Sequence, residues 1–114
     1  MEKTDVFECV TVVKRANIYF NGKITSRTIY TRDNQKKTLG IILPGKYEIE
    51  TREREVVEIL SGTAKVKLPG KTDWVVVNPG ETFEVPPNSV FEIEVEGEPV
   101  DYVCTYHKNR GDES

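Results

Sequence analysis

Two glutamates separated by one residue, Glu53 and Glu55, are the side chains best suited to acid–base chemistry in this chain. Residues two apart in a strand share a face, so Tyr47 and Thr51 fall on the same side as the glutamates if the backbone is extended. Two carboxylates in a confined site can have their pKa values pushed apart, so that one donates a proton while the other stays charged. Arginines alternate with the glutamates, so the stretch also fits a solvated charged loop. Both interpretations stay open here.

Alternating hydrophobicity predicts the strands that must position these side chains. Apolar residues alternate with glutamates from 90 to 96, so one face of that strand is core and the other is water. The stretches 64–68 and 47–51 repeat the pattern. Spacing of two dominates from about Phe7 onward, which leaves little room for helix. The charged stretch 32–37 is expected to be the longest loop.

Turn-forming residues divide the chain at short intervals. They are Asn21-Gly22, Pro44-Gly45, Ser61-Gly62, Pro69-Gly70, Asn78-Pro79-Gly80, Pro86-Pro87-Asn88 and Glu96-Gly97-Glu98-Pro99. Such dipeptides supply the backbone angles of tight turns. Regular short strands between them predict a sandwich or a barrel.

Two motif spacings limit the choice between a sandwich and a barrel. Gly80 and Pro86 have the spacing of the second cupin motif, G-x5-P-x-G-x2-H, in which Phe91 stands at the histidine position. Glu55 and Gly62 have the E-x6-G spacing that ends the first cupin motif. In this order they predict an all-β, single-domain, cupin-like β-barrel of the jelly-roll type. The mouth of such a barrel accommodates one small ligand.

The histidine ligands of a cupin metal site are missing. Residues 49–51 read Ile-Glu-Thr where the first motif has His-x-His, Phe91 replaces the histidine of the second, and the only histidine is His107. A transition metal in such a barrel needs about three histidines and a carboxylate. We therefore expect no bound metal.

Residues 19–106 resemble the pyrimidine/purine nucleoside phosphorylase family of small cupins. The resemblance is carried by Phe20-Asn21-Gly22-Lys23, Gly45-x-Tyr47, Thr51, Glu53-x-Glu55, Ser61-Gly62, Asp73-Trp74, Gly80-x-x-Phe83-x-Val85-Pro86, Ser89, Phe91 and Tyr102-x-Cys104-x-Tyr106. It implies phosphorolysis, in which a nucleoside and inorganic phosphate give a free base and ribose 1-phosphate. It also implies tolerance for both purines and pyrimidines, and no metal or organic cofactor.

This reaction passes through a transition state with oxocarbenium character, so it needs an anionic or hydroxylic group near the ribose and stabilisation of the departing base. We expect Glu55, supported by Glu53, to be catalytic. Tyr47 and Thr51, from the same face, are the predicted ribose-side contacts, although barrel filling and ordinary strand structure explain them as well.

Phe91 and Tyr102 are expected to stack on the base, which would explain indifference to its identity because every base has a π-face. Plain core packing is the alternative for both, and Cys104 is expected to be a small apolar filler. The sequence has no glycine-rich phosphate loop, so Lys23, Arg27 and Arg52 are the predicted phosphate-binding residues.

Net charge and cysteine content predict the partners and the cellular compartment of the protein. With 16 basic and 19 acidic residues the net charge is −3, so we expect no nucleic-acid partner and no membrane. The cysteines lack CxxC spacing and are expected to be free thiols in the cytoplasm. The predicted division is an arm at 1–17, the cupin domain at 18–108 and a flexible tail at 109–114. Residues 10–13 fit an added strand that pairs with a barrel edge or with the partner of a homodimer.

Three other functions fit parts of this pattern. The first is a non-catalytic, metal-free cupin that binds a sugar or nucleotide, and it would not need a carboxylate pair. The second is a sugar isomerase or epimerase, which relies on a histidine or tyrosine acid–base pair inside the barrel. The third is a structural role through dimerisation, which would not explain the polar inward positions.

Overall fold

The structure of the protein, a computed structural model, describes residues 5–108. The predicted tail at 109–114 and the first four residues of the predicted arm lie outside this range. Residues 5–108 contain no helix with the length and apolarity needed to cross a bilayer.

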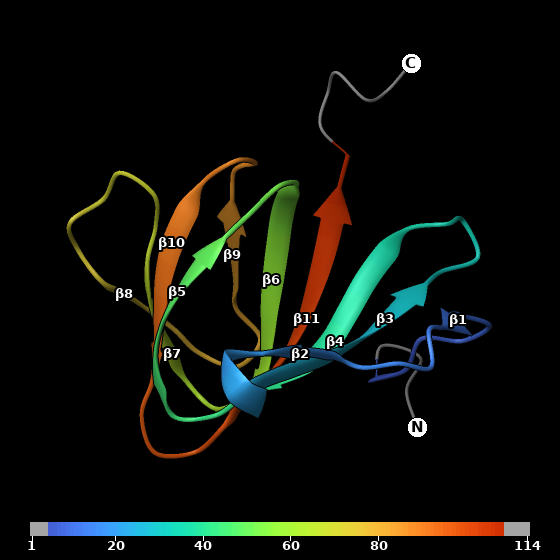
Figure 1. Cartoon of the computed structure of the whole chain (residues 1–114), viewed down its shortest axis with the longest axis horizontal. Helices are drawn as coiled ribbons and strands as arrows, with labels where there is room; N and C mark the ends of the chain where they lie inside the picture. The colour runs from blue at the N-terminus through green and yellow to red at the C-terminus, as the bar shows by residue number, and fades with distance from the viewer. Residues whose placement is uncertain (1–4, 109–114) are drawn as a thin grey trace.

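The chain forms two antiparallel sheets that face each other (Figure 1). The first contains, in pairing order, β1 (Thr11–Val12), β3 (Ile24–Tyr30), β4 (Lys36–Ile42), β11 (Val100–His107), β6 (Arg54–Ser61) and β9 (Thr82–Val85), with β2 (Asn17–Tyr19) also paired to β3. The second contains β5 (Gly45–Glu50), β10 (Val90–Val95), β7 (Ala64–Lys67) and β8 (Val75–Val77). A 3₁₀ turn, η2 (Phe20–Gly22), joins β2 to β3.

From β4 onward the chain passes repeatedly from one sheet to the other, which is the connectivity of a jelly roll. The predicted turns at 44–45, 61–62, 78–80, 86–88 and 96–99 lie at or beside these crossings. The all-β, cupin-like class is therefore confirmed. Within residues 5–108, strand hydrogen bonds do not join the two sheets into a closed barrel, and side chains fill the space between the sheets.

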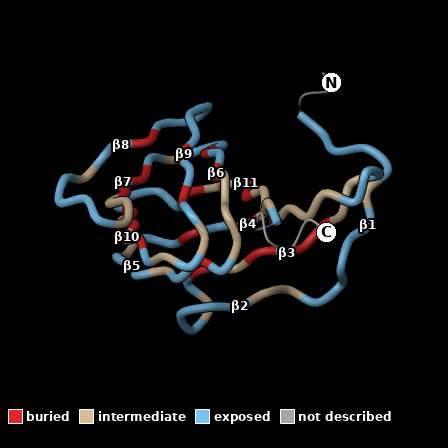
Figure 2. The backbone as a smooth tube through the Cα atoms, turned by 90° about the horizontal axis from the view of Figure 1, so that it is seen from above, coloured by how far each residue is buried: buried red, intermediate tan, exposed pale blue. Residues whose placement is uncertain are grey.

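Inward side chains of both sheets form the core, and Figure 2 shows the buried positions on strands of both sheets. In β10, Phe91, Ile93 and Val95 are buried and alternate with glutamates, as the sequence pattern predicts. Full burial of such a side chain stabilises the fold by about 1.5–3 kcal/mol. The rings of Phe83 in β9 and Phe91 in β10 meet across the gap, with their centroids 5.8 Å apart.

Two elements can be compared in detail with the sequence prediction. Residues Thr11–Val12, within the strand predicted at 10–13, form β1, which pairs with β3 at the edge of the first sheet. The expected loop at 32–37 ends earlier, because Lys36 already pairs with Tyr30 as the first residue of β4. Pairing with β3 and β11 on both sides outweighs the low strand propensity of lysine. This pairing fixes the position of the Lys36 backbone within the first sheet.

Candidate active site

A pocket of about 640 Å³ opens between the two sheets. This volume is typical of sites for small molecules. Its apolar lining includes Ile42, Val57 and Ile93, and charged, aromatic and thiol side chains complete it. A pocket of this kind contacts most of a ligand through apolar side chains and holds a few of its atoms through polar ones.

Strand register brings the polar lining together. In the first sheet Glu55 of β6 lies directly opposite Tyr106 of β11, and Lys36 begins the neighbouring strand β4. Cys104 and Tyr102 follow at steps of two along β11, so all three side chains of this row line the pocket. The inward position of Glu55 matches the parity of the buried residues Val57 and Ile59.

Glu55 is half-buried, and its Oε1 atom accepts a hydrogen bond from Sγ of Cys104 at 3.5 Å. Burial raises the pKa of the Glu55 carboxyl, and the charge of Glu53 acts in the same direction. The thiol hydrogen bond and the charge of Lys36 lower this pKa and oppose the shift only in part. Glu55 therefore keeps its proton to a higher pH than an exposed glutamate does, as a general acid requires.

The two groups beside Glu55 on β11 are neutral donors. Burial raises the pKa of the Cys104 thiol, and the charge of Glu55 raises it further. Burial likewise raises the pKa of Tyr106, whose hydroxyl lies 3.2 Å from Oγ1 of Thr38. A thiol held neutral is a hydrogen-bond donor and a poor nucleophile. Cys104 is thus a polar partner of Glu55 as well as the packing residue that the sequence suggested.

Two cations line the same end of the pocket. Nζ of Lys36 lies 3.8 Å from Oε1 of Glu53 and 4.5 Å from the centroid of the Tyr106 ring. Arg52 lies immediately before Glu53 and also lines the pocket. Amino and guanidinium groups that line one pocket can bind an anion there.

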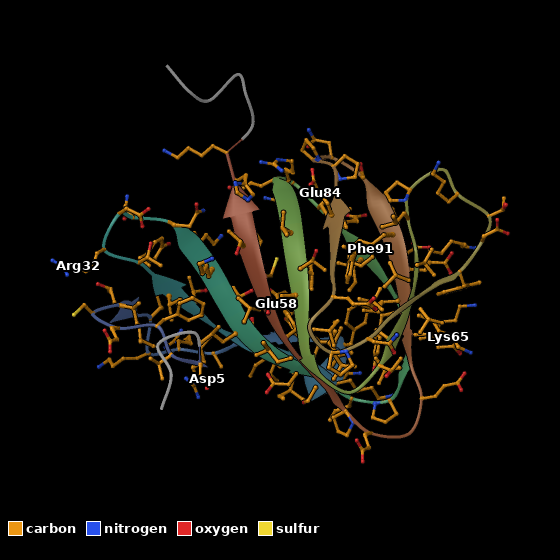
Figure 3. All side chains as sticks on the ribbon, turned by 180° about the vertical axis from the view of Figure 1, so that it is seen from behind. Asp5, Arg32, Glu58, Lys65, Glu84 and Phe91 are labelled. Carbon is orange, nitrogen blue, oxygen red and sulfur yellow. The ribbon has the colours of Figure 1, made fainter. Side chains whose placement is uncertain are left out.

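The structure brings part of the predicted site together. Glu53, Glu55, Phe91, Tyr102 and Arg52 all line the pocket. Phe91 lies between the two sheets (Figure 3). Burial raises the pKa of Tyr102 to about 12, so its hydroxyl is a donor at neutral pH.

Tyr47 and Thr51 are placed outside the pocket lining. The hydroxyl of Tyr47 donates to the carbonyl oxygens of Leu43 and Pro44, at 2.7 and 3.2 Å. Oγ1 of Thr51 donates to the carbonyl of Pro86 at 2.7 Å and accepts from the backbone N–H of Ser89 at 3.1 Å. Both hydroxyls therefore hold turns in place.

The other two predicted phosphate ligands are also outside the lining. Lys23 and Arg27 are exposed, and Arg27 donates a hydrogen bond from Nη1 to the carbonyl of Lys14. On β3 Ile24, Ser26 and Thr28 share one buried face, and Arg27 lies on the other face, where Ile29 is also buried.

Sequence reasoning missed Lys36, Tyr106 and Phe20 as pocket residues. The charged stretch 32–37 predicts a loop at Lys36, although its even spacing from Thr38 and Gly40 is a signal for the inward face. Tyr106 and Phe20 carry no signal in the sequence beyond the family pattern.

Within residues 5–108, no three His, Cys, Asp or Glu side chains gather closely enough to hold a metal ion. The donor set around Glu55 is instead one thiol, one neighbouring carboxylate and one amino group. These groups suit proton transfer and anion binding.

The jelly-roll sheets and this pocket define a small cupin-like protein whose site combines carboxylates, cations and aromatic rings. The sequence model of the pyrimidine/purine nucleoside phosphorylase family matches residues 14–106, and the chain belongs to this family.

Individual relatives agree with this assignment. A pyrimidine/purine nucleoside phosphorylase of Leptospira interrogans is 48% identical over 103 residues, which are 90% of this chain and 96% of that protein. One of Wolinella succinogenes is 52% identical over 100 residues, which are 88% of this chain and 94% of that protein. The crystal structure of a protein of unknown function from Acinetobacter sp. ADP1 superposes with a TM-score of 0.86 at 42% identity, covering 90% of this chain and 98% of that one.

Proposed function

We propose that this protein catalyses the phosphorolysis of purine and pyrimidine nucleosides to a free base and ribose 1-phosphate. The observation that carries the proposal is a half-buried carboxyl, Glu55, hydrogen-bonded to a neutral thiol and placed in one pocket with two cations. The names of the relatives point to the same reaction.

Glu55 is the general acid in this proposal. An oxygen of phosphate forms a bond to C1′ of the ribose while the bond from C1′ to the base nitrogen breaks. The base takes the bonding electron pair and the proton of Glu55, and the proton that the phosphate oxygen loses restores the acid. The raised pKa of Glu55, caused first by burial, keeps the proton available.

Glu53 is the second carboxylate of the proposed mechanism. It forms an ion pair with Lys36 at 3.8 Å, and its position beside Glu55 brings negative charge toward the ribose. Positive charge develops on the ribose in an oxocarbenium-like transition state, so this carboxylate stabilises it.

Lys36 and Arg52 are the proposed phosphate ligands. Charge-assisted hydrogen bonds from such groups to phosphate oxygens are about twice as strong as neutral ones. Phosphate that binds here also relieves Glu53 of part of its interaction with Lys36, which leaves the carboxylate free for the ribose. Tyr102 supplies a neutral hydroxyl donor, and Phe91 an apolar floor for the substrate.

The direct test is release of free base from uridine and from adenosine, with and without inorganic phosphate, in the presence of a chelator. Phosphate-dependent release that the chelator does not change is the expected result. Release without phosphate would make the protein a hydrolase, and the absence of release in both conditions would contradict the proposal.

We also propose that the protein is a homodimer in the cytoplasm. Val75 and Val76 are each 52% exposed on β8, the edge strand of the second sheet, and exposed edges of this kind tend to be covered. Cys9 and Cys104 are both free thiols, which fits a reducing compartment. Light scattering of the purified chain tests the dimer.

A further inference from the structure

We infer that Phe20 is the platform on which the nucleobase stacks, and that a left-handed turn and the ring of Tyr47 hold it in place. This inference rests on the proposed function and adds to it the residue that receives the base. It also gives a role to the Phe20-Asn21-Gly22-Lys23 motif, which the proposed chemistry does not otherwise use.

Phe20 is a partly exposed residue of the pocket lining. It begins η2, which lies between β2 and β3 and beside the start of β5 (Figure 1). The ring lines the pocket, yet the residue remains 43% exposed. Its neighbour Tyr19 also lines the pocket and is 53% exposed. Large aromatic side chains at a pocket mouth offer a ligand a flat apolar surface.

The backbone at this corner is strained. Phe20, Asn21 and Gly22 have φ values of +53°, +56° and +91°. Asparagine and glycine adopt the left-handed region readily, but for a bulky side chain it is unusual and costs about 1–2 kcal/mol. Burial of the ring does not account for this conformation, because almost half of the residue is exposed. Strain of this kind is often found where a functional side chain must be presented in one direction.

Tyr47 supports the ring of Phe20 from behind. The two ring centroids are 5.0 Å apart and the planes are tilted by 57°. Tyr47 is itself immobilised, since it is 5% exposed and its hydroxyl donates to the backbone carbonyls of Leu43 and Pro44. A Cβ atom at Gly45 would meet the Tyr47 hydroxyl at 2.7 Å, so a side chain there would displace the support.

Phe20 and the charged groups occupy opposite ends of the pocket. Lys36 is the first residue of β4 and Ile42 is the last, so their backbones are about 20 Å apart along the strand. Ile42 pairs with Ile24, which in turn pairs with Tyr19. Tyr19 and the adjacent Phe20 therefore lie at the Ile42 end of β4, away from Lys36.

Tyr102 lies between the two ends. Its partner on β4 is Gly40, which lies between Lys36 and Ile42, and its side chain lines the pocket. A nucleoside whose glycosidic nitrogen lies at Glu55, with phosphate at Lys36, therefore extends its base along the pocket toward Phe20. Stacking uses the π-face that all bases share, which gives broad base specificity without matching hydrogen bonds.

The test compares Phe20→Ala with Phe7→Ala. Phe7 is also 43% exposed, but it is not among the pocket-lining residues and packs under Nζ of Lys37 at 5.4 Å. We expect Phe20→Ala to raise KM for both uridine and adenosine about tenfold, with kcat changed less than about threefold. Phe7→Ala should leave both constants unchanged.

Phe20→Leu and Phe20→Trp separate stacking from packing. Leucine keeps an apolar contact with Tyr47 without a π-face, so we expect it to raise KM nearly as much as alanine, while tryptophan keeps KM close to the wild-type value. Thermal unfolding of each variant reports the fold, and the Leu and Trp variants decide the question if Phe20→Ala does not fold.

An unchanged KM in Phe20→Ala, or a wild-type KM in Phe20→Leu, would overturn the inference. Base release by the wild type would still support the proposed function in that case. Titration with free uracil and adenine, followed by ligand-observed NMR, is independent of turnover. Binding by the wild type that Phe20→Ala weakens would support the platform even in a chain that releases no base. Equal binding by both would reject it.

Discussion

The thiol of Cys104 on β11 donates a hydrogen bond of 3.5 Å to the carboxyl of Glu55 on β6. The two residues are 49 positions apart in the chain and meet because β6 and β11 are paired in register. The contact joins the proposed acid to a neutral donor in a half-buried setting. The predictions below follow from this pair and from the groups around it.

Replacing Glu55 by Gln should lower kcat at least about 100-fold with little change in KM, because the isosteric amide cannot donate an acidic proton to the base. Steady-state release of uracil from uridine measures both constants. Glu58→Gln is the matched control, since Glu58 is exposed on the opposite face of β6. Equal kcat in the two variants would remove Glu55 from the mechanism, and binding without turnover in the wild type would favour a non-catalytic cupin.

Cys104→Ala should move the pH profile. Protonated Glu55 is the active form, so kcat is present below its raised pKa and falls as pH rises through it. The thiol hydrogen bond lowers the pKa of Glu55, whereas burial and Glu53 raise it and Lys36 lowers it. Loss of the thiol therefore raises this pKa further and shifts the alkaline decline of kcat to higher pH.

The profile of kcat against pH for the wild type, Cys104→Ala and Cys9→Ala measures this shift. Cys9 is exposed and serves as the control. Tyr106 also contacts the Cys104 thiol, so a Tyr106→Phe profile shows whether that hydroxyl contributes. A decline at the same pH in wild type and Cys104→Ala would show that the thiol does not set the acidity of Glu55.

Lys36→Met should raise KM for phosphate about 10- to 100-fold, the effect of losing a charged hydrogen bond of about 1.5–3 kcal/mol. Lys37→Met is the control, because the two neighbours on β4 point to opposite faces and Nζ of Lys37 bonds Oγ1 of Thr105 at 2.7 Å. Initial rates at varied phosphate and saturating uridine provide the measurement. Similar phosphate constants in both variants would place the phosphate elsewhere.

Thr51→Val should lower the free energy of unfolding by about 1–3 kcal/mol and leave KM unchanged, because it removes a hydroxyl of a buried residue that bonds the backbone of both Pro86 and Ser89. Urea denaturation measures the stability loss. Thr63→Val, at an exposed position, is expected to have little effect. A raised KM with unchanged stability would return Thr51 to the substrate site.

Much of the fold was predictable because strands and turns depend on local patterns. Alternation in β10 identified Phe91, Ile93 and Val95 as inward, and turn residues located the crossings between the sheets. The same alternation placed Glu55 in phase with Val57. It did not identify β4, where two lysines precede the apolar residues and only pairing on both sides makes the segment a strand.

The sequence by itself determined the all-β class, the family and the inward side of each regular strand, because side-chain direction alternates with a period of two whatever the neighbours are. Only the tertiary structure decided which inward side chains meet. Lys36, rather than Lys23 or Arg27, lies near the carboxylates, and Tyr47 supports Phe20 without lining the pocket. These relations depend on strand register and on the packing of two sheets, which join residues far apart in the chain and leave no local signal.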